Sequence, residues 1–323
     1  MGFGAILINI PFSGAEGVMS SLFAIGIEMN EIMPLVLFIG IGAMIDFGPL
    51  LSNPKLFLFG GAAQFGIFLT ILLAAACGFS IEDAASIGII GAADGPTSIV
   101  VAQTLKSNYV GPIMVVAYSY MALVPIIQPA VIKLTTTKKE RLIRMEYKPA
   151  SVSKRTKILF PILVTIVSGL IAPASLSLVG MLMFGNLIRE CGVLNYLTDT
   201  AKDVLTNLVT LFLGITIAFT MKAENFITVQ TLMIMGLGLC AFIFDTFSGV
   251  MLAKVMNLFL KEKINPMIGA AGISAFPMSA RIVQKMGIKE DPTNHLLMHA
   301  VGANVSGQIA SAIVGGLIIG LVL

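Results

Sequence analysis

Charged residues are scarce in this sequence. Lys, Arg, Asp and Glu together account for 11 % of its 323 residues, whereas soluble domains contain about 25 %. The three cysteines, Cys77, Cys191 and Cys240, lie far apart, so they indicate neither a disulfide framework nor a cysteine-based metal cluster. The formal net charge of +3 is too small to indicate nucleic-acid binding. Residues 1–12 lack the basic stretch that begins a cleavable signal peptide.

Long apolar runs dominate the sequence instead. It is 57 % hydrophobic, and its runs have about 17–25 residues, the length that a helix needs to cross a bilayer. A membrane β-barrel would show shorter segments of alternating hydrophobicity. We therefore predict an all-α polytopic membrane protein. The predicted spans cover residues 31–47, 54–77, 109–134, 157–173, 175–190, 203–221, 228–252 and 293–323, whereas residues 1–27 are too interrupted to span alone.

One carboxylate interrupts an otherwise uncharged segment. Asp94 is the only charged residue among residues 86–103, and the neighbouring Gly91, Gly95 and Pro96 break helices. A carboxylate at the centre of a membrane helix costs about 2.5–3.5 kcal/mol on insertion scales. Broken backbone at that depth survives only where protein or a wet cavity covers it. We interpret residues 83–105 as a re-entrant segment with an ion site at its tip. The alternative is a buried turn in which Asp94 only caps a half-helix.

A second broken segment, residues 264–285, carries a different set of polar groups. Asn265 and Ser274 offer neutral oxygens, Gly269 allows the backbone to turn its carbonyls inward, and Arg281 brings a cation. Oxygen atoms of these kinds are the ligands that hard cations prefer. The sequence therefore predicts a second contribution to an ion site from this segment.

The last span adds a polar stripe. Asn304, Gln308 and Ser311 follow one another at about one helical turn, so they share a face. Close packing between membrane helices is the alternative explanation for Ser311. For Asn304 we favour a functional role. Asp245, a further acid within an apolar run, is a reserve candidate.

The two broken segments occupy corresponding positions in two halves of the chain. Residues 37–41 recur at 211–215, and residues 90–93 recur at 268–271, at offsets of 174 and 178 residues. Paired interrupted segments of this kind are typical of transporters built from inverted repeats. We predict a first membrane half (1–134), a basic loop (135–156) and a second membrane half (157–323).

The basic loop orients the molecule. Residues 133–157 contain nine of the twenty Lys and Arg residues but only two acids, so the positive-inside rule places this stretch in the cytoplasm. Counting spans from there, the segment 83–105 opens outward, the segment 264–285 opens inward, and the C-terminus lies outside. We expect the two tips to meet near the middle of the membrane.

Longer motifs match one family. They are GAADGPT at 91–97, YSYMALVPIIQP at 118–129, INP at 264–266 and Asn304. Together they resemble the beta subunit of sodium-pumping biotin-dependent decarboxylases, which include the oxaloacetate, methylmalonyl-CoA, glutaconyl-CoA and malonate enzymes. The resemblance covers nearly the whole chain. Family members usually begin with a further membrane segment, and this sequence starts inside that pattern.

The resemblance implies an energy-converting pump in a bacterial or archaeal cytoplasmic membrane. A carboxyltransferase alpha subunit would move carboxylate onto biotin held by a carrier subunit or domain, not by this chain. The beta subunit would decarboxylate that carboxybiotin, consume a proton and export Na⁺. A small gamma or delta membrane subunit is the further partner, and a homo-oligomer is compatible with the sequence.

The resemblance also assigns residues. By position, Asp94 is implied to be the acid linked to both sodium and the proton. The other implied functional positions are Tyr120, Asn265, Gly269, Ser274, Arg281 and Asn304. We expect sodium ligands from Asp94, Asn265, Gly269, Ser274 and Asn304. We expect Arg281 to pair with the carboxylate of carboxybiotin and Tyr120 to bind its ureido oxygen or relay the proton.

Two functions of other classes stay open at this point. A sodium-coupled secondary transporter would use the same inverted repeat without decarboxylation, and a membrane anchor would only hold the complex. The acid or acyl-CoA that the complex decarboxylates does not follow from this chain, because that choice belongs to the carboxyltransferase partner.

Overall fold

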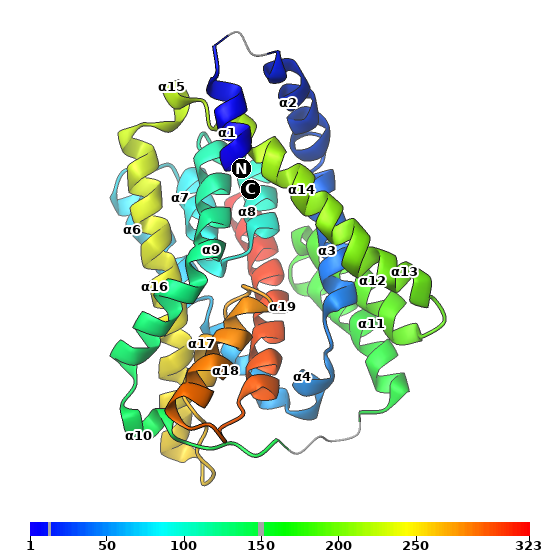
Figure 1. Ribbon diagram of the computed structural model, residues 1–323, viewed down its shortest axis with the longest axis vertical. Coiled ribbons are helices and arrows are strands. Elements are labelled where there is room, and N and C mark those ends of the chain that lie inside the picture. Colours follow the sequence, from blue (N-terminus) through cyan, green and yellow to red (C-terminus); the bar gives the residue numbers. More distant parts are fainter. Residues whose placement is uncertain (12–13, 148–151) are drawn as a thin grey trace.

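The protein is built from helices throughout its described ranges. The computed structural model describes residues 1–11, 14–147 and 152–323, and no β-strand occurs in them (Figure 1). This confirms the predicted all-α class. The physical reason is that a backbone in lipid must satisfy its N–H and C=O groups within its own segment. The basic loop predicted at 135–156 falls partly on residues 148–151, which lie outside the described residues.

Five helical stretches are long and apolar enough to cross a membrane. Three are single helices: α9 (Val110–Thr135), α16 (Val229–Phe259) and α19 (Leu297–Val322). Pro54–Ala76 consists of η2 (Pro54–Leu56), α5 (Phe57–Ala62) and α6 (Phe65–Ala76). Asn195–Thr220 consists of α13 (Asn195–Asp199), η5 (Thr200–Leu205), α14 (Thr206–Ile217) and η6 (Ala218–Thr220). These stretches lie where the sequence predicts the spans 54–77, 109–134, 203–221, 228–252 and 293–323.

A bent pair near the N-terminus brings the number of such stretches to six if it counts as one span. It joins Ala15–Glu28 to α3 (Ile32–Met44) at an angle of 63°. Asn30 and Glu31 have positive φ values of 59° and 50°, which end the first helix. The first part contains α2 (Ala15–Phe23) and η1 (Ala24–Glu28), and α1 (Gly2–Asn9) precedes it.

The helices at the predicted spans 157–173 and 175–190 differ from these six. α11 (Lys154–Ile171) and α12 (Leu176–Cys191) pack on each other around η4 (Pro173–Ser175), and α12 packs on α3. α12 has only 16 residues, and three of the first four residues of α11 are basic. For these reasons neither reaches the length and apolarity of the other spans.

Residues 81–104 form a first hairpin. α7 (Ile81–Gly88) continues into η3 (Ile89–Ala92), the chain breaks at Ala93, and α8 (Gly95–Thr104) follows. Asp83 at the start of the hairpin accepts hydrogen bonds from Ser107 and Asn108 at its end, at 2.7 and 2.8 Å. The segment therefore reverses direction, as the sequence predicts for residues 83–105.

Residues 265–290 form a second hairpin at the other end of the molecule. It contains α17 (Met267–Ala270) and α18 (Met278–Glu290). Asn265 at the start of the hairpin and Asn294 after it both donate to the carbonyl of Ile143, at 2.8 and 3.1 Å, so this segment also returns to its starting level. In Figure 1, α7 and α8 lie in the upper half of the molecule, whereas α17 and α18 lie in the lower half.

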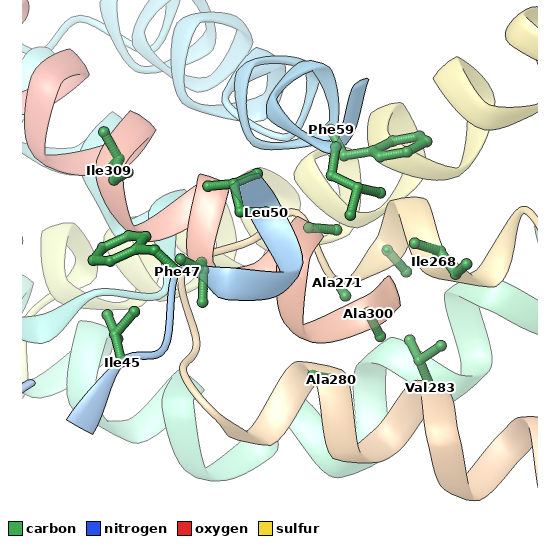
Figure 2. Close-up of a cluster of buried hydrophobic side chains, with 14 of the residues drawn as sticks. Ile45, Phe47, Leu50, Phe59, Ile268, Ala271, Ala280, Val283, Ala300 and Ile309 are labelled. Carbon is green, nitrogen blue, oxygen red and sulfur yellow. The ribbon is translucent and has the colours of Figure 1, made fainter. Parts of the chain in front are cut away.

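A large apolar cluster fixes the second hairpin in place. Figure 2 shows side chains of the segment 45–50, α5, α17, α18 and α19 meeting in this cluster. Labelled members are Ile45, Phe47, Leu50, Phe59, Ile268, Ala271, Ala280, Val283, Ala300 and Ile309. Three short helices complete the fold: α4 (Gly48–Ser52), α10 (Lys138–Arg141) and α15 (Ala223–Phe226).

Candidate functional site

Asp94 lies at the tip of the first hairpin, at the point where the chain breaks. It is the N-cap of α8 and has an extended backbone, and Ala93 before it has a left-handed conformation with a φ of 53°. Pro96 occupies the first turn of α8, where its missing N–H costs nothing. Local sequence therefore places a carboxylate at a helix N-terminus inside the protein, where only 3 % of Asp94 is exposed.

The Asp94 carboxylate is surrounded by neutral donors. Its Oδ2 accepts hydrogen bonds from Thr97 Oγ1 at 2.8 Å, Gln308 Nε2 at 2.9 Å and Ser311 Oγ at 3.1 Å. Its Oδ1 accepts a longer bond from the backbone N–H of Thr97 at 3.5 Å. No Lys or Arg of the described ranges forms an ion pair with it. The site thus combines one acid with hydroxyl and amide groups, the oxygen chemistry that suits a hard monovalent cation.

The second hairpin touches the first at this level. The backbone N–H and the Oγ of Ser274 both donate to the carbonyl of Ala92, at 3.2 and 2.7 Å. Asn304 of α19 donates from Nδ2 to the carbonyl of Ile273 at 2.6 Å, while its Oδ1 is buried without a hydrogen-bond partner. Ser274 and Asn304 therefore lie at the contact between the tips, next to the residues that hold Asp94.

Tyr118 also faces the tip of the first hairpin, although the sequence did not single it out. Its ring occupies the space beside Gly95, where an added Cβ would lie 2.4 Å from Tyr118 Cε2. Its hydroxyl is buried without a hydrogen-bond partner. The motif at residues 118–129 contains Tyr118 and Tyr120, but residues two apart on a helix point in opposite directions. Sequence alone did not reveal which one faces Asp94.

Tyr120 points away from the Asp94 carboxylate. Its hydroxyl donates to the carbonyl of Met235 on α16, and its ring lies beside Gly238. The structure therefore does not bring Tyr120 together with the residues that hold Asp94.

Asn265 and Gly269 are likewise committed to the framework. Asn265 is fully buried, and its Nδ2 donates to the carbonyls of Arg141 and Ile143 at 2.9 and 2.8 Å. An added Cβ on Gly269 would lie 2.0 Å from the carbonyl oxygen of Gly249, so α17 and α16 pack backbone to backbone there. Neither residue forms a hydrogen bond with Asp94. Both hold the second hairpin in position instead.

Arg281 lies on the exposed side of α18. Its neighbours Ala280 and Val283 point into the apolar cluster, whereas Arg281 itself is exposed. Among the residues that the structure describes, it has no ion-pair partner. It is thus an accessible cation on the helix that follows the second tip.

Basic side chains also surround a cavity of about 910 Å³ at the same end of the molecule. Its walls are residues 143–146, the turn 260–264 before the second hairpin, the start of η2 and the first turn of α19. Lys55, Lys261 and Lys263 contribute exposed ammonium groups, and His299 contributes a buried Nε2 without a hydrogen-bond partner. The lining also includes two acids, Glu146 and Glu262.

An ion-pair network ties this end together. Arg141 binds Glu290 at 2.8 Å, and Lys254 binds Glu140 at 3.1 Å. Burial would raise the pKa of the Glu140 carboxyl, but hydrogen bonds from Thr137 and Lys254 outweigh burial and lower that pKa. The chain between α9 and residue 147 is therefore fixed across the end of the second hairpin.

Comparison with known proteins places the chain in a family. Residues 1–322 match the family described as the Na⁺-transporting oxaloacetate decarboxylase beta subunit. The chain is 51 % identical to the methylmalonyl-CoA decarboxylase subunit beta of Propionigenium modestum, over 99 % of this chain and 87 % of that protein. It is 49 % identical to the glutaconyl-CoA decarboxylase subunit beta of Acidaminococcus fermentans, over 99 % and 85 % of the two chains. It is 50 % identical to the oxaloacetate decarboxylase beta chain of Klebsiella pneumoniae, over 98 % and 74 %.

These matches cover almost all of the chain, and about half of the aligned residues are identical. They include the hairpin that carries Asp94 and the segment that carries Ser274. The chain belongs to the beta-subunit family of the Na⁺-transporting, biotin-dependent decarboxylases, whose members are the membrane subunits of decarboxylase sodium pumps.

Proposed function

We propose that this subunit decarboxylates carboxybiotin presented by a partner carrier, and that Asp94 is where Na⁺ and the proton compete. In the reaction, the bond between the carboxylate carbon and the ureido nitrogen breaks, CO2 leaves, and the nitrogen takes up a proton. The observation that carries the proposal is the buried Asp94 carboxylate, held by neutral donors at the contact of two hairpins. A proton on Asp94 would remove the charge that offsets Na⁺, so both ions cannot occupy the site together.

We propose that the direct sodium ligands are Asp94, Ser274 and Asn304. Asn304 already has an unused buried Oδ1 at the tip contact. The Oγ of Ser274 would exchange its bond to the Ala92 carbonyl for a bond to the ion. Asn265 and Gly269, also expected as ligands, would act here by holding the second hairpin at the required height, since their contacts are with residues 141–143 and with α16.

The opposed hairpins suggest how transport is coupled. Exporting one charge against 100 mV costs about 2.3 kcal/mol, so the site must open to one side at a time. The first hairpin enters from one end and the second from the other, and they touch at Ser274 and Ala92. We propose that they form an inverted repeat, that the end with the second hairpin is cytoplasmic, and that separation of the tips opens each side in turn.

The partners follow from the same proposal. A carboxyltransferase alpha subunit would load the carrier, and a small gamma or delta subunit would accompany this chain in the membrane. We propose that the carrier docks at the lysine-lined cavity, since its carboxylated biotin is an anion and Lys55 and Lys261 are unpaired within the described residues. Arg281, the exposed cation of α18, is the proposed contact of the carboxylate itself. Tyr120 would bind the ureido oxygen or relay the proton only after its hydroxyl has broken its hydrogen bond to the Met235 carbonyl.

Replacing Asp94 with Asn tests the central role. Asp94→Asn keeps the side-chain volume and removes the charge, so the complex should assemble while sodium-stimulated decarboxylation falls at least about 100-fold. The assay is CO2 release and ²²Na⁺ uptake in vesicles that contain the purified complex. An assembled variant complex with near-normal sodium transport would falsify the ion-site role, and an inactive but assembled one would also exclude a mere membrane anchor.

A further inference from the structure

The structure contains a second buried carboxylate in the membrane core that the proposed mechanism does not use. Asp245 lies at the middle of α16 (Val229–Phe259), and it is completely inaccessible to solvent. Three carboxylates of the described ranges are buried, namely Asp83, Asp94 and Asp245. Their surroundings differ in a way that indicates which of them carries a charge.

The oxygens of Asp83 and Asp94 are well supplied with donors. Asp83 accepts from Ser107 and from the backbone of Asn108 on Oδ1, and from the Asn108 amide on Oδ2. Asp94 accepts three bonds on Oδ2 and one on Oδ1. Such a supply stabilises the ionised form of a carboxylate.

Asp245 has a hydrogen-bond donor for only one of its two carboxylate oxygens. Its Oδ1 accepts a hydrogen bond from the backbone N–H of Gly66 at 2.5 Å, in the first turn of α6. Its Oδ2 is buried without any hydrogen-bond partner. A carboxylate that caps a helix with one oxygen and leaves the other bare would be costly to bury in its charged form.

The backbone around the Asp245 carboxylate leaves no room for the several oxygen ligands of a metal ion. An added Cβ on Gly66 would lie 2.5 Å from Oδ1, and an added Cβ on Gly91 would lie 2.5 Å from Oδ2. A metal cation requires several oxygen ligands, whereas a proton requires only the oxygen that it binds. The occupant that fits the bare Oδ2 is therefore a proton.

Within residues 1–11, 14–147 and 152–323, no cationic side chain forms an ion pair with Asp245. The elements that pack most extensively on α16 are α5, α6, η3, α7, α9 and α17. α5, α6, η3 and α17 contain no titratable residue, α9 contributes Tyr118, Tyr120 and Lys133, and α7 contributes Glu82 and Asp83. Tyr120 is bound to Met235, and Asp83 to residues 107–108 at the outer end of the hairpin. Among the described residues, the Asp245 carboxylate forms no ion pair, and the hydrogen bond that it accepts comes from a backbone N–H.

The position of Asp245 connects it to the first hairpin. Gly91, which covers Oδ2, belongs to η3 and lies three residues before Asp94. An ionised Asp245 would place an unsolvated charge against the back of η3, and a neutral one allows η3 to pack there. Its protonation is therefore linked to the docking of the hairpin that carries Asp94.

We propose that Asp245 is a second proton-binding site of the membrane core, occupied while the first hairpin packs on α16 and vacated when the hairpin moves away. Binding of the proton does not depend on the proposed function. The link to turnover does depend on it, since the decarboxylation consumes a proton.

Infrared difference spectroscopy tests the site itself. The complex should show the carbonyl stretch of a neutral carboxylic acid at neutral pH, with the usual small shift in D2O. Asp245→Asn should abolish that band, whereas Asp94→Asn and the control Asp83→Asn should keep it. Persistence of the band in Asp245→Asn, or its absence from the unchanged complex, would overturn the site. Because the Asp94→Asn complex is included, this result does not depend on whether Asp94 binds sodium.

The pH profile of turnover tests the link to the hairpin. Asn can accept the Gly66 hydrogen bond through Oδ1 but cannot exchange a proton. Asp245→Asn should therefore shift the pH profile of sodium-stimulated CO2 release by about one unit and lower its maximum about tenfold. An unchanged profile in an assembled complex that has lost the infrared band would show that the proton is only structural, and would overturn the proposed link. Asp83→Asn serves as the control, since its carboxylate lies outside this contact.

Discussion

At the scale of single residues, two tyrosines two positions apart have opposite surroundings. Tyr118 lies beside Gly95 with an unpaired hydroxyl, whereas the hydroxyl of Tyr120 is bound to the carbonyl of Met235. A buried hydroxyl without a partner is costly, by about 1–3 kcal/mol. A group of that kind next to the tip of a proposed ion site is most simply explained by a ligand that binds it during turnover.

A pair of tyrosine substitutions distinguishes these surroundings. If the Tyr118 hydroxyl contacts the ion or its hydration water, a bond worth about 1 kcal/mol is lost in Tyr118→Phe. The sodium concentration for half-maximal CO2 release should then rise about fivefold. Tyr120→Phe should leave that concentration within about twofold and reduce the maximal rate instead. Sodium titrations of both variants provide the measurement, and equal sodium shifts would refute the distinction.

The positions of some side chains, as distinct from their roles, could be predicted from sequence where local signals were strong. Asp94 was identifiable because a charge between glycine and proline in an apolar run has few explanations. Gln308 and Ser311 were placed on the correct face by helical spacing, and they do contact Asp94. Asn265 was expected to be a ligand, but its bonds to residues 141–143 depend on a loop that is more than 100 residues away in the sequence. Contacts of that range leave no local signal.

At the scale of elements, close backbone contacts determine how the second hairpin is held. Gly249 of α16 and Gly269 of α17 face each other so closely that each would place an added Cβ within about 2.1 Å of the other's carbonyl oxygen. Small residues allow membrane helices to approach in this way. The sequence predicted the break around residues 264–285, but it could not predict the contact, because glycine there is equally compatible with a turn.

Alanine substitutions test this contact. Gly269→Ala forces backbone apart and should destabilise the complex by about 1–3 kcal/mol. Gly236→Ala, at an exposed position of the partner helix α16, is the control, since an added Cβ there meets no atom within 4 Å. Alanine also favours a helix over glycine by up to about 1 kcal/mol. Thermal unfolding in detergent should therefore shift downward for the first and stay or rise for the second. A Gly269→Ala complex as stable as the unchanged one would contradict the close contact.

At the scale of the whole molecule, the basic loop between the two halves predicts how the chain is oriented in a membrane. The composition gave the helical class and most span positions, because apolar length is visible in sequence. The opposed placement of the hairpins is visible in Figure 1, and the internal repeat that suggested it remains a proposal. α11 and α12 are the weakest of the predicted spans, since the charges of α11 and the length of α12 are marginal for a bilayer.

Cysteine labelling tests the proposed orientation. In a variant without Cys77, Cys191 and Cys240, a cysteine at exposed Lys139 should react with an impermeant maleimide only from the cytoplasmic side. A cysteine added after Leu323 should react only from outside. Inverted and right-side-out vesicles provide the comparison. Labelling of both positions from one side would exclude the proposed count of spans.

The last prediction concerns how the carrier reaches the cytoplasmic end. Lys55 and Lys261 line the cavity and are exposed and unpaired within the described residues, as are Lys138 and Lys139 outside it. Exposed ion pairs contribute about 0.2–1 kcal/mol each. Neutralising both cavity lysines to Gln should therefore raise the half-saturating concentration of carboxylated carrier about three- to tenfold, with the maximal rate and sodium dependence retained.

The double variant Lys138→Gln and Lys139→Gln removes the same charge from the same end of the molecule, which makes it a matched control. Screening by salt weakens interactions between exposed charges beyond a Debye length of about 10 Å at 0.1 M, so a difference due to the cavity should shrink as salt is added. Equal effects of the two double variants would mean that the carrier senses only overall charge. If neither variant changed the carrier titration while Arg281→Gln did, the carrier would dock on α18 and not at the cavity.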